Sequence, residues 1–147
     1  MKKYILFILI GLTMASCNKE EKEREENKEE ILNMFRNNKF ISNTEVPITI
    51  NFGRIYRDPH PMLDIDSVFI TYADGSCSFY TDGILSGLYN YHLFQNNDEI
   101  ILYHAIPNVD RNFVYHILDK RYNLKIINEN IFELGDQNGI ISFYKYN

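Results

Sequence analysis

The sequence predicts an all-β domain, in which an antiparallel meander closes into a barrel of about eight strands. Segments rich in Ile, Val, Phe and Tyr follow one another after Lys39, separated by Asn, Asp, Gly and Pro. They recur about every ten to twelve residues, a spacing typical of barrels and sandwiches. The region before Lys39 lacks this pattern and consists of an apolar leader and a charged segment.

The first sixteen residues have the layout of a secretory signal peptide. A basic start at Lys2 and Lys3 precedes an apolar run over residues 4–12. This run is shorter than the roughly 20 residues of a permanent membrane helix. Small residues then lead up to residue 17, as they do before a signal cleavage site. We therefore expect residues 1–16 to be removed.

Residues 14–17, Met-Ala-Ser-Cys, resemble the lipobox of bacterial lipoproteins, with Met14 in the place where leucine is usual. In that family the cysteine receives a diacylglyceryl group, the signal is cleaved before it, and the new amino terminus is acylated. The resemblance implies that Cys17 is lipidated and anchors the protein, because two or more acyl chains hold a protein stably on a membrane. The alternative is an ordinary cleaved signal followed by a chance cysteine.

Lys19, Glu20 and Glu21 follow the lipobox closely. A lysine followed by two acids at this place looks like the surface-export signal of lipoproteins in one Gram-negative group. The resemblance implies a lipid-anchored protein of the outer membrane that faces the cell exterior, although the sequence does not fix the leaflet. The alternative is that these three residues belong to a solvated spacer.

Residues 18–30 contain seven Glu, four Lys or Arg and no apolar residue. Such a segment is typical of a solvated tether. Its residue types also favour a helix, to which the apolar residues of 31–35 would give one apolar side. Asn37 and Asn38 would end this helix, so we predict a helix over about residues 20–37.

The expected strands cover residues 46–52, 67–73, 76–81, 87–95, 99–106, 112–119, 123–128, 130–134 and 139–146. Ala73-Asp74-Gly75-Ser76 predicts a tight hairpin, because Asp-Gly tolerates the positive φ values of a type I′ turn. Further turns are expected at 96–98, 128–130 and 135–139. Pro59 and Pro61 predict an irregular loop, since neither residue can donate a hydrogen bond to a sheet.

Three Tyr-His pairs recur at an interval of twelve residues: Tyr91-His92, Tyr103-His104 and Tyr115-His116. Their midpoints, residues 98 and 110, fall on the expected turns at 96–98 and 108–112. Antiparallel strands mirrored about these turns would place the pairs side by side. Strand alternation would then put the three tyrosines on one face and the three histidines on the other.

The three histidines suggest a metal site, because three imidazoles on one face can bind zinc. The favoured alternative is cross-strand packing of half-exposed rings, since a metal site also needs partners that orient the imidazoles. The tyrosines of the same region, Tyr89, Tyr91, Tyr103 and Tyr115, would form an aromatic floor for a sugar or lipid ligand. The alternative is that they belong to the core, because tyrosine suits a pleated surface and buries much area.

Four short stretches have a common resemblance: residues 72–76, the strand start Gly87-Leu88-Tyr89, residues 115–127 and the closing residues 141–145. They resemble the lipocalin-like domains of bacterial lipoproteins, in which residues 115–127 would be the penultimate hairpin. The resemblance covers about residues 38–147 and implies an eight-stranded antiparallel barrel that sometimes holds a small ligand. It implies no fixed catalytic residues. The family's frequent Gly-x-Trp is absent, since this chain has no Trp.

The charge balance and the cysteine count limit the classes of function. The chain has 15 basic and 20 acidic residues, a net charge of −5, and both charges of the leader are basic. An acidic mature chain without a basic stripe gives no support for nucleic-acid binding, and lipid rather than charge must anchor it. With Cys17 acylated, Cys77 has no partner for a disulfide and is expected to be a small buried side chain.

The sequence contains no Gly-x-Ser-x-Gly elbow, phosphate-binding glycine loop or His-Glu-x-x-His helix, so we expect neither an enzyme nor a cofactor. It predicts a signal peptide at 1–16, a lipidated cysteine with a tether at 17–37 and a β domain at 38–147. The expected function is binding of a small apolar or glycan ligand, or of a partner protein, at a membrane. The alternative is a structural or interaction module with a filled core.

Overall fold

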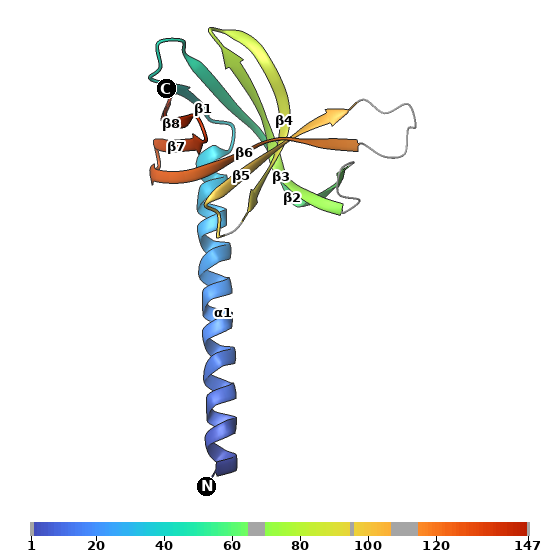
Figure 1. Cartoon of the computed structure of the whole chain (residues 1–147), viewed down its shortest axis with the longest axis vertical. Helices are drawn as coiled ribbons and strands as arrows, with labels where there is room; N and C mark the ends of the chain where they lie inside the picture. Colours follow the sequence, from blue (N-terminus) through green and yellow to red (C-terminus); the bar gives the residue numbers. More distant parts are fainter. Residues whose placement is uncertain (1, 65–69, 95, 107–114, 147) are drawn as a thin grey trace.

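A barrel of eight strands stands on one end of a long helix in the computed structural model of the chain (Figure 1). The structure describes residues 2–64, 70–94, 96–106 and 115–146, and the side chains of residues 19–57, 72–94, 96–104 and 119–146. Within the described part of the chain, no helix is both long and apolar enough to cross a bilayer.

One helix precedes eight strands: α1 (Lys2–Phe35), β1 (Lys39–Ser42), β2 (Ile48–Asp64), β3 (Ile70–Thr81), β4 (Ile84–Phe94), β5 (Glu99–Ile106), β6 (Tyr115–Asn128), β7 (Ile131–Asp136) and β8 (Gly139–Lys145). Each strand pairs with the next along the chain, and β8 closes the barrel by pairing antiparallel with β1. The outer end of β2 also pairs in parallel with the start of β6. The predicted all-β fold, an antiparallel meander closed into a barrel, is confirmed.

The hairpin predicted at residues 73–76 is wrong, because β3 runs through it without a turn. A Cβ atom at Gly75 would lie 2.7 Å from the carbonyl oxygen of Arg54 and 2.7 Å from the hydroxyl of Tyr91. Glycine is therefore needed there for close packing within a strand. The tight turn lies instead at Asp82-Gly83, which joins β3 to β4 with φ values of 50° and 77°, the positive values that a type I′ turn requires.

Two further predictions about the strands are wrong. The loop expected at Pro59 and Pro61 is part of β2. Pro59 falls within a register shift between Ile55 and His60, whereas Pro61 lies opposite Tyr72 on β3. The penultimate hairpin expected at 115–127 is the single strand β6. The resemblance implied a turn within this stretch, but β6 continues through it, with Asp119 as the extra residue of a bulge opposite β5.

The remaining predictions have mixed outcomes. The turns expected at 96–98, 128–130 and 135–139 are confirmed by the β4–β5, β6–β7 and β7–β8 connections. Strand β1 was not among the expected strands. The turn expected at 108–112 lies outside the described residues.

The C-terminal end of α1 is inserted into one end of the barrel. Phe35 is completely buried, and its ring stacks on that of Phe52 with the centroids 3.9 Å apart. Its edges meet the rings of Phe40, Tyr91 and Phe132 at centroid distances of 6.2, 6.1 and 5.3 Å. Aromatic pairs in these arrangements stabilise a core beyond the area that they bury. The helix therefore closes this end of the barrel.

A two-residue cap ends α1 at this point. Asn37 adopts a φ of 53°, the left-handed conformation that commonly terminates helices. The Asn38 side-chain amide donates to the carbonyl oxygen of Met34 at 2.7 Å, which satisfies one of the last carbonyls of the helix. The chain then turns directly into β1. The helix ends at Phe35, and Asn37 and Asn38 cap it, which confirms the predicted end of the helix.

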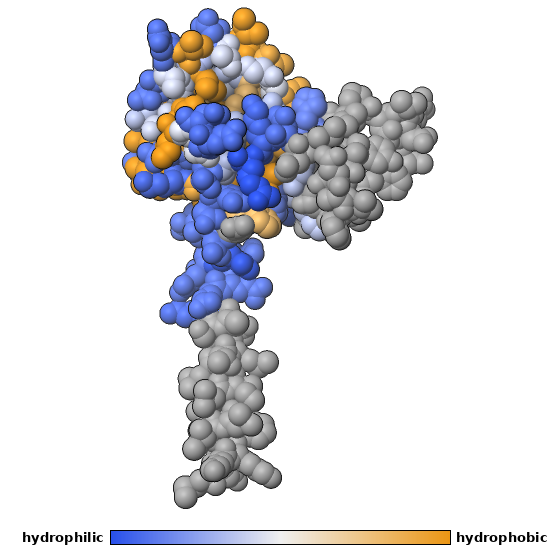
Figure 2. Space-filling view, viewed as in Figure 1, coloured by the Kyte–Doolittle hydropathy of each residue, from blue (hydrophilic) through white to orange (hydrophobic). Residues whose placement is uncertain are grey.

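The charged part of α1 is helical, as predicted for residues 20–37, and projects from the barrel (Figure 1, Figure 2). Lys19 and Lys22 lie 3.7 Å and 3.6 Å from the glutamates one turn further on, and such pairs support an exposed helix. The helix also begins earlier than the predicted residue 20. We call its exposed part, residues 19–30, the stalk.

The core has one large and one small part. The large part fills the barrel and includes Ile31 and Phe35, which precede the domain boundary expected at residue 38. The small part joins Ala73, Ile101 and Tyr103 on the opposite face of the sheet. Cys77 is buried in the large part as expected, and its burial raises the pKa of its thiol, which keeps it protonated.

Phe35→Ala should reduce the free energy of unfolding of the mature chain by about 3–5 kcal/mol, since it leaves a cavity among four aromatic rings. Arg36→Ala, at the next and exposed position, should change it by no more than about 0.5 kcal/mol. Urea unfolding followed by circular dichroism measures both values. Equal stability of the two variants would contradict the insertion of the helix into the barrel.

Candidate functional site

A cavity of about 190 Å³ opens at the end of the barrel opposite α1. It lies between the start of β2, the β3–β4 hairpin, the middle of β6 and the β7–β8 hairpin. Its lining consists of Ile48, Phe79, Thr81, Ser86, Tyr89, Leu102, Lys120, Tyr122, Leu134, Asp136, Gly139, Ile141 and Phe143. The sequence places it there because one end of the barrel is filled by α1 and the other is not.

The depth of the cavity is apolar and its mouth is polar. Leu102, Leu134 and Phe143 are buried at its floor, whereas Ser86 and Lys120 are exposed. Such a distribution is usual for small-molecule sites, in which apolar walls supply contact area and a few polar groups orient the ligand.

Two tyrosines stand between the floor and the mouth. The Tyr89 ring meets Phe79 edge-on at 5.5 Å, and burial followed by the charge and a hydrogen bond of Asp119 raises the pKa of Tyr89. Burial, Asp136 and Asp119 likewise raise the pKa of Tyr122. Both hydroxyls therefore remain protonated at neutral pH, so each can donate and accept a hydrogen bond.

The four predicted ligand tyrosines do not form one floor. Tyr89 lines the cavity, and Gly87 leaves the space that its ring occupies. Tyr91 is completely buried in the aromatic layer around Phe35, and its burial raises the pKa of its hydroxyl. Tyr103 belongs to the small core on the opposite face. The Tyr115 side chain lies outside the described residues. Sequence reasoning missed Tyr122, whose position in the barrel depends on the long strand β6.

The predicted register of the three Tyr-His pairs is wrong. Tyr89, rather than His92, lies opposite His104, a shift of three residues, and Ile117, rather than His116, lies opposite His104 on the other side. An odd shift moves a residue to the other face of a sheet, so His92 and His104 point to opposite faces. The second shift is already present at the end of β5, where Ile106 lies opposite Tyr115, before the bulge at Asp119.

The first shift originates in the β4–β5 turn. Asn96 and Asn97 have positive φ values of 29° and 65° and form the centre of the turn, whereas the predicted centre was residue 98. No group of three His, Cys, Asp or Glu in the described part of the chain is arranged to hold a metal ion. The His116 side chain lies outside that part.

Asp74 joins the stalk to the barrel. Lys28 Nζ lies 2.7 Å from Asp74 Oδ1, and His92 Nδ1 lies 3.1 Å from Asp74 Oδ2. The backbone N–H of Leu93 also donates to Asp74 Oδ2 at 2.8 Å. Sequence reasoning missed this cluster, because it assigned Lys28 to a solvated tether and Asp74 to a turn.

The environment of Asp74 favours its charged form. Burial alone would raise the pKa of Asp74, but the contacts with His92, Lys28 and the Leu93 N–H together hold it below its ordinary value. A second contact fixes the same orientation, since the Asn97 side-chain amide donates to the carbonyl oxygen of Arg24 in the stalk at 3.1 Å. Two contacts, one between Lys28 and Asp74 and one between Asn97 and Arg24, therefore fix the direction of the stalk relative to the barrel.

No family model, curated protein or solved structure matches the chain. The case for a function therefore depends on the cavity, the stalk and the N-terminal motif.

Asp74→Asn should destabilise the protein in a pH-dependent manner. A lowered native pKa gives stability that is complete above the unfolded-state value of about 3.9 and is lost as the pH falls through the native value. The difference in unfolding free energy between wild type and Asp74→Asn should therefore be largest near neutral pH and shrink in acid. Urea unfolding at a series of pH values measures it, and a difference independent of pH would contradict the assignment.

Lys28→Ala provides a second test of the same cluster. It leaves the buried Asp74 carboxylate without its closest cation, which should cost about 1–3 kcal/mol of unfolding free energy. Lys22→Ala is the matched control, because Lys22 pairs with Glu26 only at the exposed surface and such pairs contribute at most about 1 kcal/mol.

Proposed function

We propose that this protein is a non-enzymatic bacterial lipoprotein, held on the outer membrane by acyl chains on Cys17, whose barrel binds a small ligand carrying one apolar ring. The observation that carries this proposal is the cavity at the end of the barrel opposite α1. The same helix would bear the anchor at its other end, so anchor and ligand site would be separated by the whole barrel.

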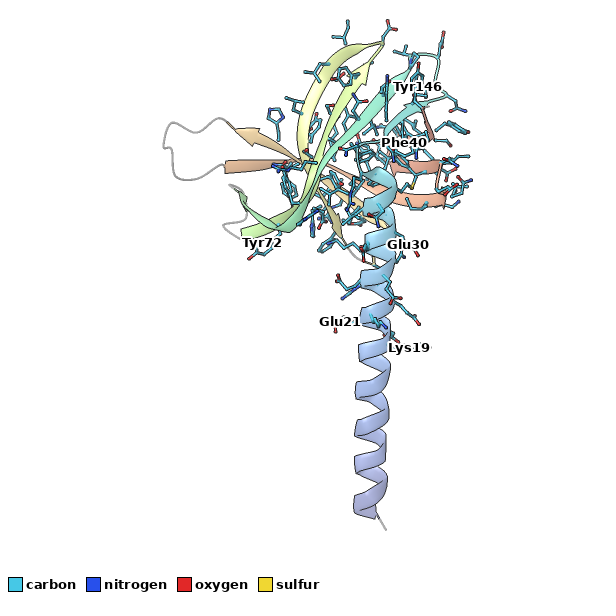
Figure 3. The ribbon with its side chains drawn as sticks, turned by 180° about the vertical axis from the view of Figure 1, so that it is seen from behind. Lys19, Glu21, Glu30, Phe40, Tyr72 and Tyr146 are labelled. Carbon is cyan, nitrogen blue, oxygen red and sulfur yellow. The ribbon has the colours of Figure 1, made fainter. Side chains whose placement is uncertain are left out.

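The stalk would separate the barrel from the lipid anchor at Cys17. Cleavage before Cys17 would leave α1 with its charged part intact, and a helix rises 1.5 Å per residue. The segment from Cys17 to Ile31 then spans roughly 20 Å. Lys19 and Glu21 lie on the stalk outside the barrel (Figure 3), and Glu20 is exposed beside them. All three are accessible to an export machinery, which supports their proposed role as a signal for transfer to the cell exterior.

The volume of the cavity limits the ligand. An apolar cavity of about 150 Å³ is large enough for benzene, so about 190 Å³ accommodates one ring or the end of an acyl chain. A sugar ring or a phenyl ring would lie against Tyr89, while Tyr122 and Lys120 would orient its polar substituents.

A second candidate is an interaction module without a small-molecule ligand. The cavity volume of about 190 Å³ favours it, because typical ligand sites measure roughly 300–1,000 Å³. The aromatic layer around Phe35 fills the rest of the barrel interior.

Ile141→Trp separates the two candidates, since the larger side chain would fill the cavity. Phenyl glucoside, methyl glucoside and short alkanols are suitable probes, with binding measured by thermal shift and calorimetry. At least one probe should stabilise the wild type and fail to stabilise Ile141→Trp. Ile127→Trp is the matched control, because Ile127 is an exposed isoleucine outside the cavity lining and its variant should bind as wild type does.

Ser86→Trp gives an independent check in case Ile141→Trp folds poorly. Ser86 is exposed at the mouth, so its replacement should block entry without disturbing the core. If no probe binds the wild type, or if all three variants bind equally, the ligand site is refuted and the interaction module is supported.

Cys17→Ala should abolish lipidation, since acyl transfer requires the thiol. The variant should lose incorporation of radioactive palmitate in a bacterial host and remain uncleaved or leave the membrane fraction. Cys77→Ala is the control with the other cysteine replaced and should keep the label. Palmitate incorporation into Cys17→Ala would refute the proposed anchor.

A further inference from the structure

Four exposed apolar residues surround the mouth of the cavity. Val46, Ile84, Leu85 and Ile140 have exposed fractions of 53%, 74%, 49% and 72%. Val46 lies in the β1–β2 connection, Ile84 and Leu85 begin β4, and Ile140 is the second residue of β8, so the four residues lie at or beside three connections. We call these four residues the apolar rim. Apolar atoms are visible at this end of the barrel, away from the hydrophilic stalk (Figure 2). Clustered exposed apolar residues mark interaction surfaces in soluble domains.

Each part of the apolar rim adjoins the lining of the cavity. Ile140 stands between the lining residues Gly139 and Ile141, and Val46 precedes Ile48. The Asp82 N–H donates to the carbonyl oxygen of Pro47 at 2.9 Å, which holds the β3–β4 hairpin against the β1–β2 connection. The rim and the cavity therefore form one continuous surface with a central recess.

The mouth is negatively charged. Asp136 lines it, while Glu45 and Asp82 lie on the same connections as the apolar rim and are exposed. Asp119 is close enough to raise the pKa of both cavity tyrosines. Lys120 is the one basic residue of the cavity lining that the structure describes. Carboxylates that surround an apolar recess favour a partner of positive charge.

We infer that the apolar rim docks a segment of a partner protein in which a bulky apolar side chain, best a phenyl ring, stands between lysines or arginines. The ring enters the cavity, the neighbouring aliphatic parts cover the rim, and the cations face Glu45, Asp82 and Asp136. This inference rests on the proposed function, because the partner segment would supply the apolar ring that the cavity is proposed to bind.

The other two occupants of such a surface fit less well. An anionic leaflet would be repelled by the carboxylates at the mouth, and the stalk directs the mouth away from the membrane that would hold Cys17. A second copy of the chain would bring the same negative groups together, which costs free energy. A segment with both basic and apolar side chains matches the negative charge of the mouth and fills the apolar recess.

The test uses three short fluorescent peptides and the mature chain. One peptide carries Phe between lysines, one carries Phe between glutamates, and one carries Ala between lysines. Fluorescence anisotropy should show binding of the first and at least about tenfold weaker binding of the other two. The affinity of the first peptide should fall in salt of about 1 M, where charges are screened beyond roughly 3 Å.

Exposed residues supply the protein variants, so that folding is preserved. Ile84→Ser combined with Ile140→Ser removes half of the apolar rim and should weaken the Phe-Lys peptide about tenfold. Ile127→Ser is the matched control, because Ile127 is also exposed, at 44%, but lies at the far end of β6. Glu45→Gln with Asp82→Asn should weaken binding and reduce its dependence on salt.

Four outcomes overturn the inference. If the Phe-Glu peptide binds as well as the Phe-Lys peptide, the negative charge of the mouth does not select the partner. If Ile84→Ser/Ile140→Ser binds the Phe-Lys peptide as wild type does, the apolar rim does not contact it. Binding of the mature, unacylated chain to anionic vesicles in place of the peptide would assign the surface to lipid. If the peptide fails while phenyl glucoside still binds, the docking inference alone is wrong; if neither binds the wild type, the proposed small-ligand site fails as well.

Discussion

The insertion of Phe35 into the barrel is the contact on which the remaining architecture depends. This one side chain joins the helix to the aromatic rings of Phe52, Tyr91 and Phe132, which come from three different strands. It closes one end of the barrel, so the cavity lies at the other end. It also makes the stalk continuous with the core. The molecule therefore has two distinct ends, one that bears the N-terminal motif and one that bears the cavity.

The polar contacts around Asp74 have a different role from this packing. A buried ion pair contributes little net stability compared with apolar groups of the same size, because both charges lose their hydration. Removing one partner is nevertheless costly, and this makes alternative orientations of the stalk unfavourable. Lys28, His92 and the Leu93 N–H all approach one carboxylate. Phe35 thus holds the helix in the barrel, and Asp74 fixes the direction in which the helix leaves it.

The sequence predicts the barrel because that prediction uses local information, namely residue types and turn spacing. It fails where the decisive neighbour is distant in the chain. Asp74-Gly75 and Asp82-Gly83 look alike locally, but Gly75 must be small because Tyr91 packs against it, and only the second pair forms a turn. The register of the Tyr-His pairs failed at the β4–β5 turn, which is centred on Asn96 and Asn97. The resulting odd shift places His92 and His104 on opposite faces of the sheet. Tyr89 was predicted to contact a ligand from its residue type, whereas its position in the cavity follows from the register.

The size of the cavity follows from the same insertion. Phe35 packs on Phe132 at 5.3 Å, Phe132 stacks on Phe143 at 5.2 Å, and Phe143 forms part of the cavity floor. This row of rings fills the barrel from the helix to the floor and leaves room for about one ring at the mouth. A smaller plug would enlarge the cavity but weaken the connection between stalk and barrel. The barrel therefore holds its stalk firmly at the expense of cavity volume, and under the proposed function a recess this shallow would depend on the apolar residues around its mouth to hold a ligand.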